Sequence, residues 1–124
     1  MITQDWLLRQ VESLHLMVTR LLLHKDTAAY ELPQSREDYD DTDRLCALVR
    51  ACTKNSDYET VLELLDTAED RFSLGFAELA LEAYAALNSL DDTSLEDGGI
   101  TRRDIERGIK QLATERGFTL WKEE

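Results

Sequence analysis

Residues 76–90 read FAELALEAYAALNSL, and apolar side chains go almost completely round the helix that this stretch predicts. Only Glu78, Glu82 and Ser89 form a narrow polar stripe along it. A helix that is apolar on nearly all sides needs neighbours on several sides, so we expect it at the centre of a bundle. The small residues that would let neighbouring backbones approach it closely are Ala77, Ala80, Ala83 and Ala86.

Helix-forming patterns continue on both sides of this stretch, and the chain has only five glycines and one proline among 124 residues. The predicted helices run from a Thr3 cap to about residue 24, and over about 43–54, 57–71, 74–90 and 101–117. Most links between them are short, which favours antiparallel neighbours. We therefore predict a single all-α domain over 1–124, with about five helices packed as antiparallel hairpins.

Local signals define several helix ends. Ser56 with Glu59, and Thr101 with Asp104, have the spacing of capping boxes, and Gly117 suits a left-handed C-terminal cap. Residues 26–42, which contain Pro33 and a dense set of acids, are predicted to be either an acidic linker or an ordered loop. The acidic stretch 91–99, DDTSLEDGG, is expected to separate the last two helices.

The formal net charge of −12 argues against nucleic acid and anionic membranes as main partners, because both carry the same sign. No run approaches the roughly 20 apolar residues of a membrane span. Cys46 and Cys52 are six residues apart in a predicted helix, too far apart around its axis for a disulfide. We expect both to be small hydrophobic residues of a protein in the reducing cytoplasm.

Carboxylates are the strongest candidates for chemistry. The four that follow a spacing of 4, 3 and 4 on the third helix are Glu59, Glu63, Asp66 and Asp70. Together with Glu78 and Glu82 they resemble the metal-binding acids of all-α nucleotide pyrophosphatases, which makes a metal-dependent hydrolase an alternative. The opposite side of that helix carries Val61, Leu64, Leu65, Ala68 and Phe72. We therefore predict that the acids face solvent and hold no metal.

The remaining motifs do not assemble a catalytic set. His15 and His24 are nine residues apart and have no nucleophile or carboxylate at a useful spacing, so we expect both to be structural. Gly98-Gly99 is an isolated pair that indicates a turn and not a phosphate-binding loop. We predict no catalytic residue and no cofactor.

The last helix is basic. Residues 101–116 carry five basic and three acidic side chains, which leaves −14 on the rest of the chain. Ile105 and Ile109 define a core-facing side, so Arg102, Arg103 and Arg107 are predicted to point outward and to contact an acidic protein surface. A nucleic-acid binder through this helix is a weaker alternative, because acids interleave with the arginines.

The first helix has two apolar faces. Leu7, Val11, Leu14, Val18 and Leu21 follow a 4-3-4-3 spacing, whereas Leu16 and Leu23 fall roughly on the opposite side. Either residues 26–42 cover this second face within one molecule, or the face pairs with another copy in a homodimer, and we predict the homodimer. The predicted contact residues of this helix are Trp6, Leu16, Met17 and Leu23.

Three stretches carry a resemblance: QDWLLRQVESL at 4–14, FAELALEAYAALNSLDD at 76–92 and GGITRRDIERGIKQLA at 98–113. In these the chain resembles a small uncharacterised family of bacterial helical proteins related to tetratricopeptide repeats. The resemblance implies repeat-like helical hairpins but no particular activity. No second copy is visible at a 34-residue period, so a repeat array is not expected. The sequence thus favours a non-enzymatic protein-interaction or assembly module.

Overall fold

The structure is a computed structural model, and it describes residues 4–119. Its elements are α1 (Gln4–Leu23), the 3-10 helix η1 (Arg36–Asp38), α2 (Asp41–Lys54), α3 (Tyr58–Asp66), α4 (Leu74–Asn88), α5 (Asp92–Asp97) and α6 (Arg102–Glu115). No β-strand occurs among the described residues, and the predicted all-α fold is confirmed. Six α-helices form where about five were expected, because α5 lies in the stretch predicted to be only a separator.

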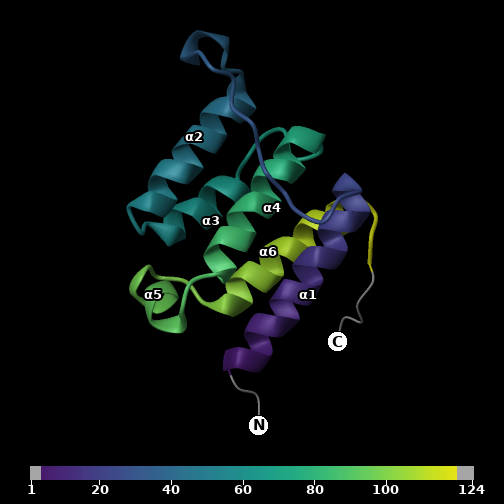
Figure 1. The fold of residues 1–124 in the computed structure, drawn as a ribbon, viewed down its shortest axis with the longest axis vertical. Helices are drawn as coiled ribbons and strands as arrows, with labels where there is room; N and C mark the ends of the chain where they lie inside the picture. Colours follow the sequence, from purple (N-terminus) through teal and green to yellow (C-terminus); the bar gives the residue numbers. More distant parts are fainter. Residues whose placement is uncertain (1–3, 120–124) are drawn as a thin grey trace.

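The centre of the bundle is α4, as its all-round apolar sequence predicts (Figure 1). The helices α1 and α6 pack against one another and against α4, while α2 and α3 form a second pair that also contacts α4. Nine of the 15 residues of α4 are buried, including Phe76, Leu79 and Leu87. Of the four alanines expected to allow close approach, Ala77, Ala80 and Ala83 are buried, but Ala86 is exposed.

The caps of α6 form as predicted. The Thr101 side chain accepts from the Asp104 backbone N–H at 3.3 Å, and the Asp104 carboxylate accepts from the Thr101 N–H at 2.8 Å. At the other end Gly117 takes a left-handed φ of 89°, and the Phe118 N–H donates to the Ala113 carbonyl. Both ends of this helix thus have local partners for their free backbone groups.

The start of α3 differs from the prediction by one residue. Ser56 has a left-handed φ of 60°, and Asp57 is the N-cap, accepting from the Thr60 N–H at 3.4 Å. The predicted capping box of Ser56 and Glu59 is therefore wrong. The physical reason is that the Ser56 backbone is used to end α2: its N–H donates to the Thr53 carbonyl.

The end of α3 comes at Asp66, five residues before the predicted end at Arg71. The acids that follow would place negative charge at the negative end of the helix dipole, which disfavours further helix. Two side chains cap the last carbonyls instead. The Thr67 hydroxyl donates to the Glu63 carbonyl at 2.8 Å, and the Arg71 guanidinium donates to the carbonyl of Leu65.

The unpredicted helix α5 is a capped helix of six residues, with Leu95 as its one buried residue. Asp91 accepts from the Ser94 N–H at 2.7 Å, and this bond lowers the pKa of Asp91 below its ordinary value. Leu95 and Ile100 are both buried, and the Ile100 N–H donates to the Leu95 carbonyl across the left-handed Gly99. A short helix of this kind is stable only because its apolar residues pack on the bundle.

Of the two alternatives for residues 26–42, the structure has the ordered loop. The Ala29 N–H donates to Glu78 at 2.7 Å, and the Tyr30 N–H donates to Glu82 at 3.0 Å, so the loop is fastened to α4. Within residues 4–119, no helix is long and apolar enough to cross a bilayer.

The sequence also predicts that the apolar residues after the last helix, Phe118, Leu120 and Trp121, pack back onto the body. Of the predictions about the chain ends, the Thr3 cap of the first helix and the packing of Leu120 and Trp121 lie outside the described residues. Phe118, predicted to pack back onto the body together with them, is described and lies against the core.

Gly108 offers a test of the packing between α4 and α6. A Cβ atom added there would lie 2.5 Å from the Tyr84 hydroxyl oxygen and 2.6 Å from its ring carbon Cζ, and Tyr84 is itself buried. We expect Gly108→Ala to lower the free energy of unfolding by about 1–2 kcal/mol, because overpacking outweighs the gain in helix propensity. Urea denaturation measures this change.

Gly75→Ala is the matched control, because its added Cβ would meet its nearest neighbour at an ordinary 3.7 Å. This change should leave stability the same or raise it by up to about 1 kcal/mol. Equal effects of the two substitutions would contradict the close approach at Gly108.

Candidate interaction surfaces

The four carboxylates predicted to lie on the third helix are exposed to solvent, and Asp70 lies beyond the end of α3. Glu59, Glu63, Asp66 and Asp70 are all exposed, while Val61 on the other side of the helix is fully buried. The prediction that these acids face water is confirmed.

Glu78 and Glu82 of α4 have a different role from the acids of α3. Glu78 pairs with Lys25 at 2.8 Å, and Glu82 pairs with Arg50 of α2 at 2.8 Å. Arg50 also donates to the Tyr30 carbonyl at 2.6 Å, so both carboxylates hold the 26–42 loop against α4. Within residues 4–119, no three His, Cys, Asp or Glu side chains are placed to hold one metal ion.

Tyr30 and Asp43 link the same loop to the start of α2. The Tyr30 hydroxyl donates to the Asp43 carboxylate at 2.6 Å, and that carboxylate also accepts from the Asp40 N–H at 2.9 Å. These hydrogen bonds lower the pKa of Asp43, while burial and the bond to Asp43 raise the pKa of the Tyr30 hydroxyl. The carboxylate is therefore charged and committed to the cap of α2.

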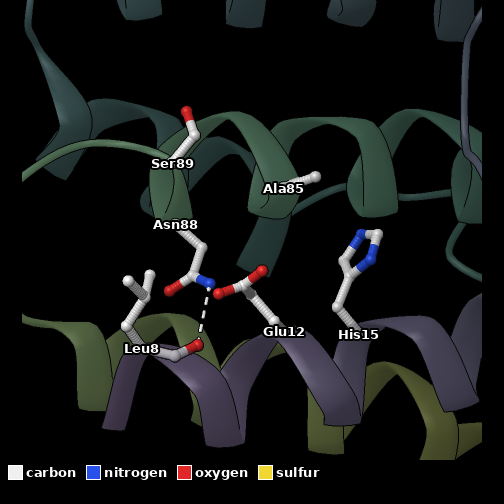
Figure 2. Close-up of a pocket in the computed structure, with 6 residues that line it drawn as sticks. All are labelled: Leu8, Glu12, His15, Ala85, Asn88 and Ser89. Atoms are coloured by element: carbon white, nitrogen blue, oxygen red, sulfur yellow. Dashed lines mark hydrogen bonds between the residues drawn. The ribbon is translucent and has the colours of Figure 1, made fainter. Parts of the chain in front are cut away.

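A hollow of about 360 Å³ lies between α1 and α4 (Figure 2). His15 and Asn88, two of its polar side chains, are engaged with the backbone. His15 Nε2 donates to the Leu81 carbonyl at 2.6 Å, and the Asn88 amide donates to the Leu8 carbonyl at 3.4 Å. Because a carbonyl only accepts, Nε2 of His15 carries a proton, and Nδ1 faces the Thr19 hydroxyl. The histidine thus joins two helices, as a structural residue does.

Arg102 is not an outward contact residue, and this part of the prediction is wrong. Its side chain is only 4% exposed. Nη1 donates to both the backbone carbonyl and the side-chain oxygen of Asn88, at 2.7 and 2.8 Å, and Nη2 donates to Leu90 O and Asp92 at 2.8 and 2.9 Å. The free carbonyls at the end of α4 attract this cation, which explains why it turns inward.

The other two predicted arginines of α6 do lie at the surface. Arg103 pairs with Glu106 at 3.0 Å, and Arg107 pairs with Asp104 at 3.2 Å. Both pairs lie within α6, so its own acids offset most of the positive charge that suggested an acidic partner.

The predicted contact residues of α1 divide between two environments. Trp6 is 45% exposed, and Met17 lines a shallow groove between α1 and α6 that Lys110 also lines. Leu16 is half-buried, whereas Leu23 packs against the core.

A second exposed surface was not predicted. Phe72, in the turn from α3 to α4, is 70% exposed, and Leu74, the first residue of α4, is 69% exposed. Leu48 on α2 is 49% exposed. A groove of about 310 Å³ lies between the start of α2 and the end of α3, and its lining includes Asp70 and Phe76, which flank Phe72 and Leu74 in the chain; we call it the α2–α3 groove. Its apolar lining is Leu45, Leu64, Ala68 and Phe76, and its acids are Asp41, Glu69 and Asp70.

The sequence contains signals for this surface. Ser73 is the N-cap of α4, so Phe72 precedes the cap and would normally pack against the fourth helical residue. That residue is Ala77, which is small and fully buried, so it leaves Phe72 uncovered. Leu74 is four residues before Glu78 and therefore lies on the polar stripe of α4. The prediction that Phe72 belongs to the buried side of the third helix is wrong.

These features define a small acidic all-α bundle whose buried polar groups serve its own packing. The chain belongs to the DUF6483 family, described as a family of unknown function, whose model matches residues 1–117. No curated protein and no solved structure matches the chain. Membership of an uncharacterised family agrees with the resemblance seen in the sequence, whereas the relation to tetratricopeptide hairpins stays a prediction.

The contrast between Arg102 and its neighbour Arg103 can be measured. We expect Arg102→Ala to lower the free energy of unfolding by about 3–5 kcal/mol, because it leaves the carboxylate of Asp92 and several buried acceptors without their partner. Arg103→Ala should change it by no more than about 0.5 kcal/mol. Thermal and urea denaturation followed by circular dichroism gives both values. A loss below about 1 kcal/mol for Arg102→Ala would show that the buried guanidinium does not hold the helices together.

Proposed function

We propose that the protein is a non-enzymatic interaction module that binds another protein through its exposed apolar surface. The observation that carries the proposal is the pair Phe72 and Leu74, two large apolar side chains about 70% exposed on either side of a helix cap. Burying such a side chain fully is worth about 1.5–3 kcal/mol. Exposed residues of this kind beside an apolar groove are characteristic of contact surfaces.

The polar interior supports this proposal over a catalytic one. The half-buried acids Glu78 and Glu82 bind the loop, and the buried Arg102 binds the end of α4. Side chains that are fully committed to packing in this way are poor candidates for acid–base work or metal binding. The alternative of a metal-dependent hydrolase therefore has less support.

The nucleic-acid alternative is also less well supported. Arg102 is turned inward, and Arg103 and Arg107 pair with acids on their own helix. A binder of phosphates needs cations that are free to replace counterions.

We place this activity in the reducing cytoplasm. Cys46 and Cys52 are both free thiols, and burial raises the pKa of the Cys46 thiol to about 11, which keeps it protonated and unreactive.

The packed pair α2 and α3 is the part of the fold that supports a repeat-like helical hairpin.

Partner capture tests the proposal. With the tagged protein as bait in its native cell, we expect at least one protein to be enriched by the wild type and lost with Phe72→Ala/Leu74→Ala. These substitutions keep the Ser73 cap, so folding should be retained. The variant Thr93→Ala/Glu96→Ala, at exposed positions of α5, is the control and should capture the same protein. Identical captures by all three proteins would contradict an interaction through Phe72 and Leu74.

Self-association through α1 is a second candidate. It is favoured by the exposure of Trp6, on the same helix as the groove-lining Met17. A stable dimer needs about 800 Å² of buried surface on each subunit, so the roughly three turns of α1 from Trp6 to Met17 would need help from α6.

Sedimentation velocity tests this dimer. We expect the wild type to sediment as a dimer in the micromolar range and Trp6→Ala/Leu16→Glu to sediment as a monomer, since a carboxylate at the interface would have to be desolvated. Leu23→Glu is less informative because Leu23 packs on the core. A wild type that is monomeric throughout, unchanged in the variant, would remove this candidate.

A further inference from the structure

The α2–α3 groove combines an apolar floor with apolar side chains that protrude beside it. Leu45, Leu64 and Phe76 line it, and the exposed Leu48 is three residues from Leu45 on the same face of α2. Asp41 and Leu48 are seven residues apart on that face, a rise of about 10.5 Å. Two apolar residues seven positions apart on a partner helix have the same separation. The face of α2 from Asp41 to Leu48 therefore has the length needed to contact such a helix.

Two of the three acids that line this groove, Glu69 and Asp70, make no ion pair within residues 4–119. Within residues 4–119, no ion pair involves any of the exposed acids on α3 and the turn that follows it, which are Glu59, Glu63, Asp66, Glu69 and Asp70.

The nearby cations make their hydrogen bonds and ion pairs with groups other than Glu69 and Asp70. Arg71 turns away to Glu115, with which it makes an ion pair at 2.7 Å, and Arg116 donates to the carbonyls of Arg71 and Ser73. Arg44 pairs with Asp41 at the edge of the groove. An apolar groove is therefore bordered by a one-sided excess of negative charge.

We infer that the α2–α3 groove binds an amphipathic helical segment of another protein, with apolar anchors on one face and Lys or Arg beside them. The inference rests on the proposed interaction function and names the chemistry of the partner. The anchors would contact Leu45, Leu64 and Phe76, and the exposed Phe72 and Leu74, between the groove-lining Asp70 and Phe76 in the chain, would add apolar contact. The cations would face Glu69 and Asp70, which increases the association rate and selects against acidic segments.

The charge argues against the other occupants of such a surface. Anionic lipid and nucleic acid carry the same sign as the groove. A second copy docked groove to groove would bring the same acids together, and each copy carries a net charge of −12. Of these occupants, only a basic amphipathic segment can both bury apolar side chains on the groove floor and place cations beside its acids.

Binding of synthetic peptides to the full chain tests the inference. The probe is a fluorescein-labelled amphipathic peptide of about 18 residues, long enough to form helix, with leucines at i, i+4, i+7 and i+11 and lysines on the flanks. Two further peptides keep the leucines and replace every lysine by glutamine or by glutamate. We expect the lysine peptide to bind most tightly, with a Kd that rises with salt, and the glutamate peptide to bind at least about tenfold more weakly.

Variants of the chain locate the binding. Phe72→Ala/Leu74→Ala should raise the Kd of the lysine peptide about tenfold or more. Glu69→Lys/Asp70→Lys should raise it by a similar factor and flatten its salt dependence. Glu96→Lys/Asp97→Lys, which reverses two exposed acids of α5, makes the same charge change elsewhere and should alter the Kd by no more than about twofold.

The outcomes separate this inference from the proposed function. Equal binding of the lysine and glutamine peptides, or binding of the lysine peptide that ignores Phe72 and Leu74, overturns the inference and leaves an interaction role intact. Failure of all three peptides, together with self-association lost in Phe72→Ala/Leu74→Ala, makes the groove an interface between copies and also overturns it. Absence of peptide binding, self-association and partner capture overturns both proposals.

Discussion

The buried guanidinium of Arg102 is the interaction on which the bundle depends. It comes from the first turn of α6 and satisfies the carbonyls of Asn88 and Leu90 where α4 ends, and it pairs with Asp92 at the start of α5. Asn88 in turn donates to a carbonyl of α1. Three helices therefore meet at one cation, and Asn88 links them to α1. The cation lies where the dipole of the central helix is negative. A core of leucine and alanine alone would specify the register of the helices less strictly, because apolar contact is not directional.

This use of arginine inside the molecule shapes its outside. Arg50, Arg71 and Arg102 all serve contacts between elements of the chain, and Arg103 and Arg107 pair within α6. The acids of α3 and the following turn are left to solvent. The distribution of charge at the surface is thus a consequence of which arginines stabilise the interior. The α2–α3 groove lies beside two of the acids that remain exposed, Glu69 and Asp70.

Much of the helical pattern could be predicted, and the errors have identifiable causes. The ends of α2, α4 and α6 fall within about two residues of prediction because caps and apolar periodicity are local signals. The end of α3 was placed too late, since the periodicity continues through Phe72 while the charges oppose a longer helix. The helix α5 was missed because its six residues have too few turns for a periodic signal and depend on the packing of Leu95.

The sequence by itself determined that the chain is helical, that α4 is surrounded, and that the carboxylates of α3 face water, because each follows from residue spacing along one helix. Only the tertiary structure decided that Arg102 is buried while Arg103 is exposed, that Glu78 and Glu82 hold a loop, and that Phe72 and Leu74 remain uncovered. Those outcomes depend on which groups lie across the bundle. A side chain's own helix sets the direction in which it points, but the element opposite supplies its partner and its burial.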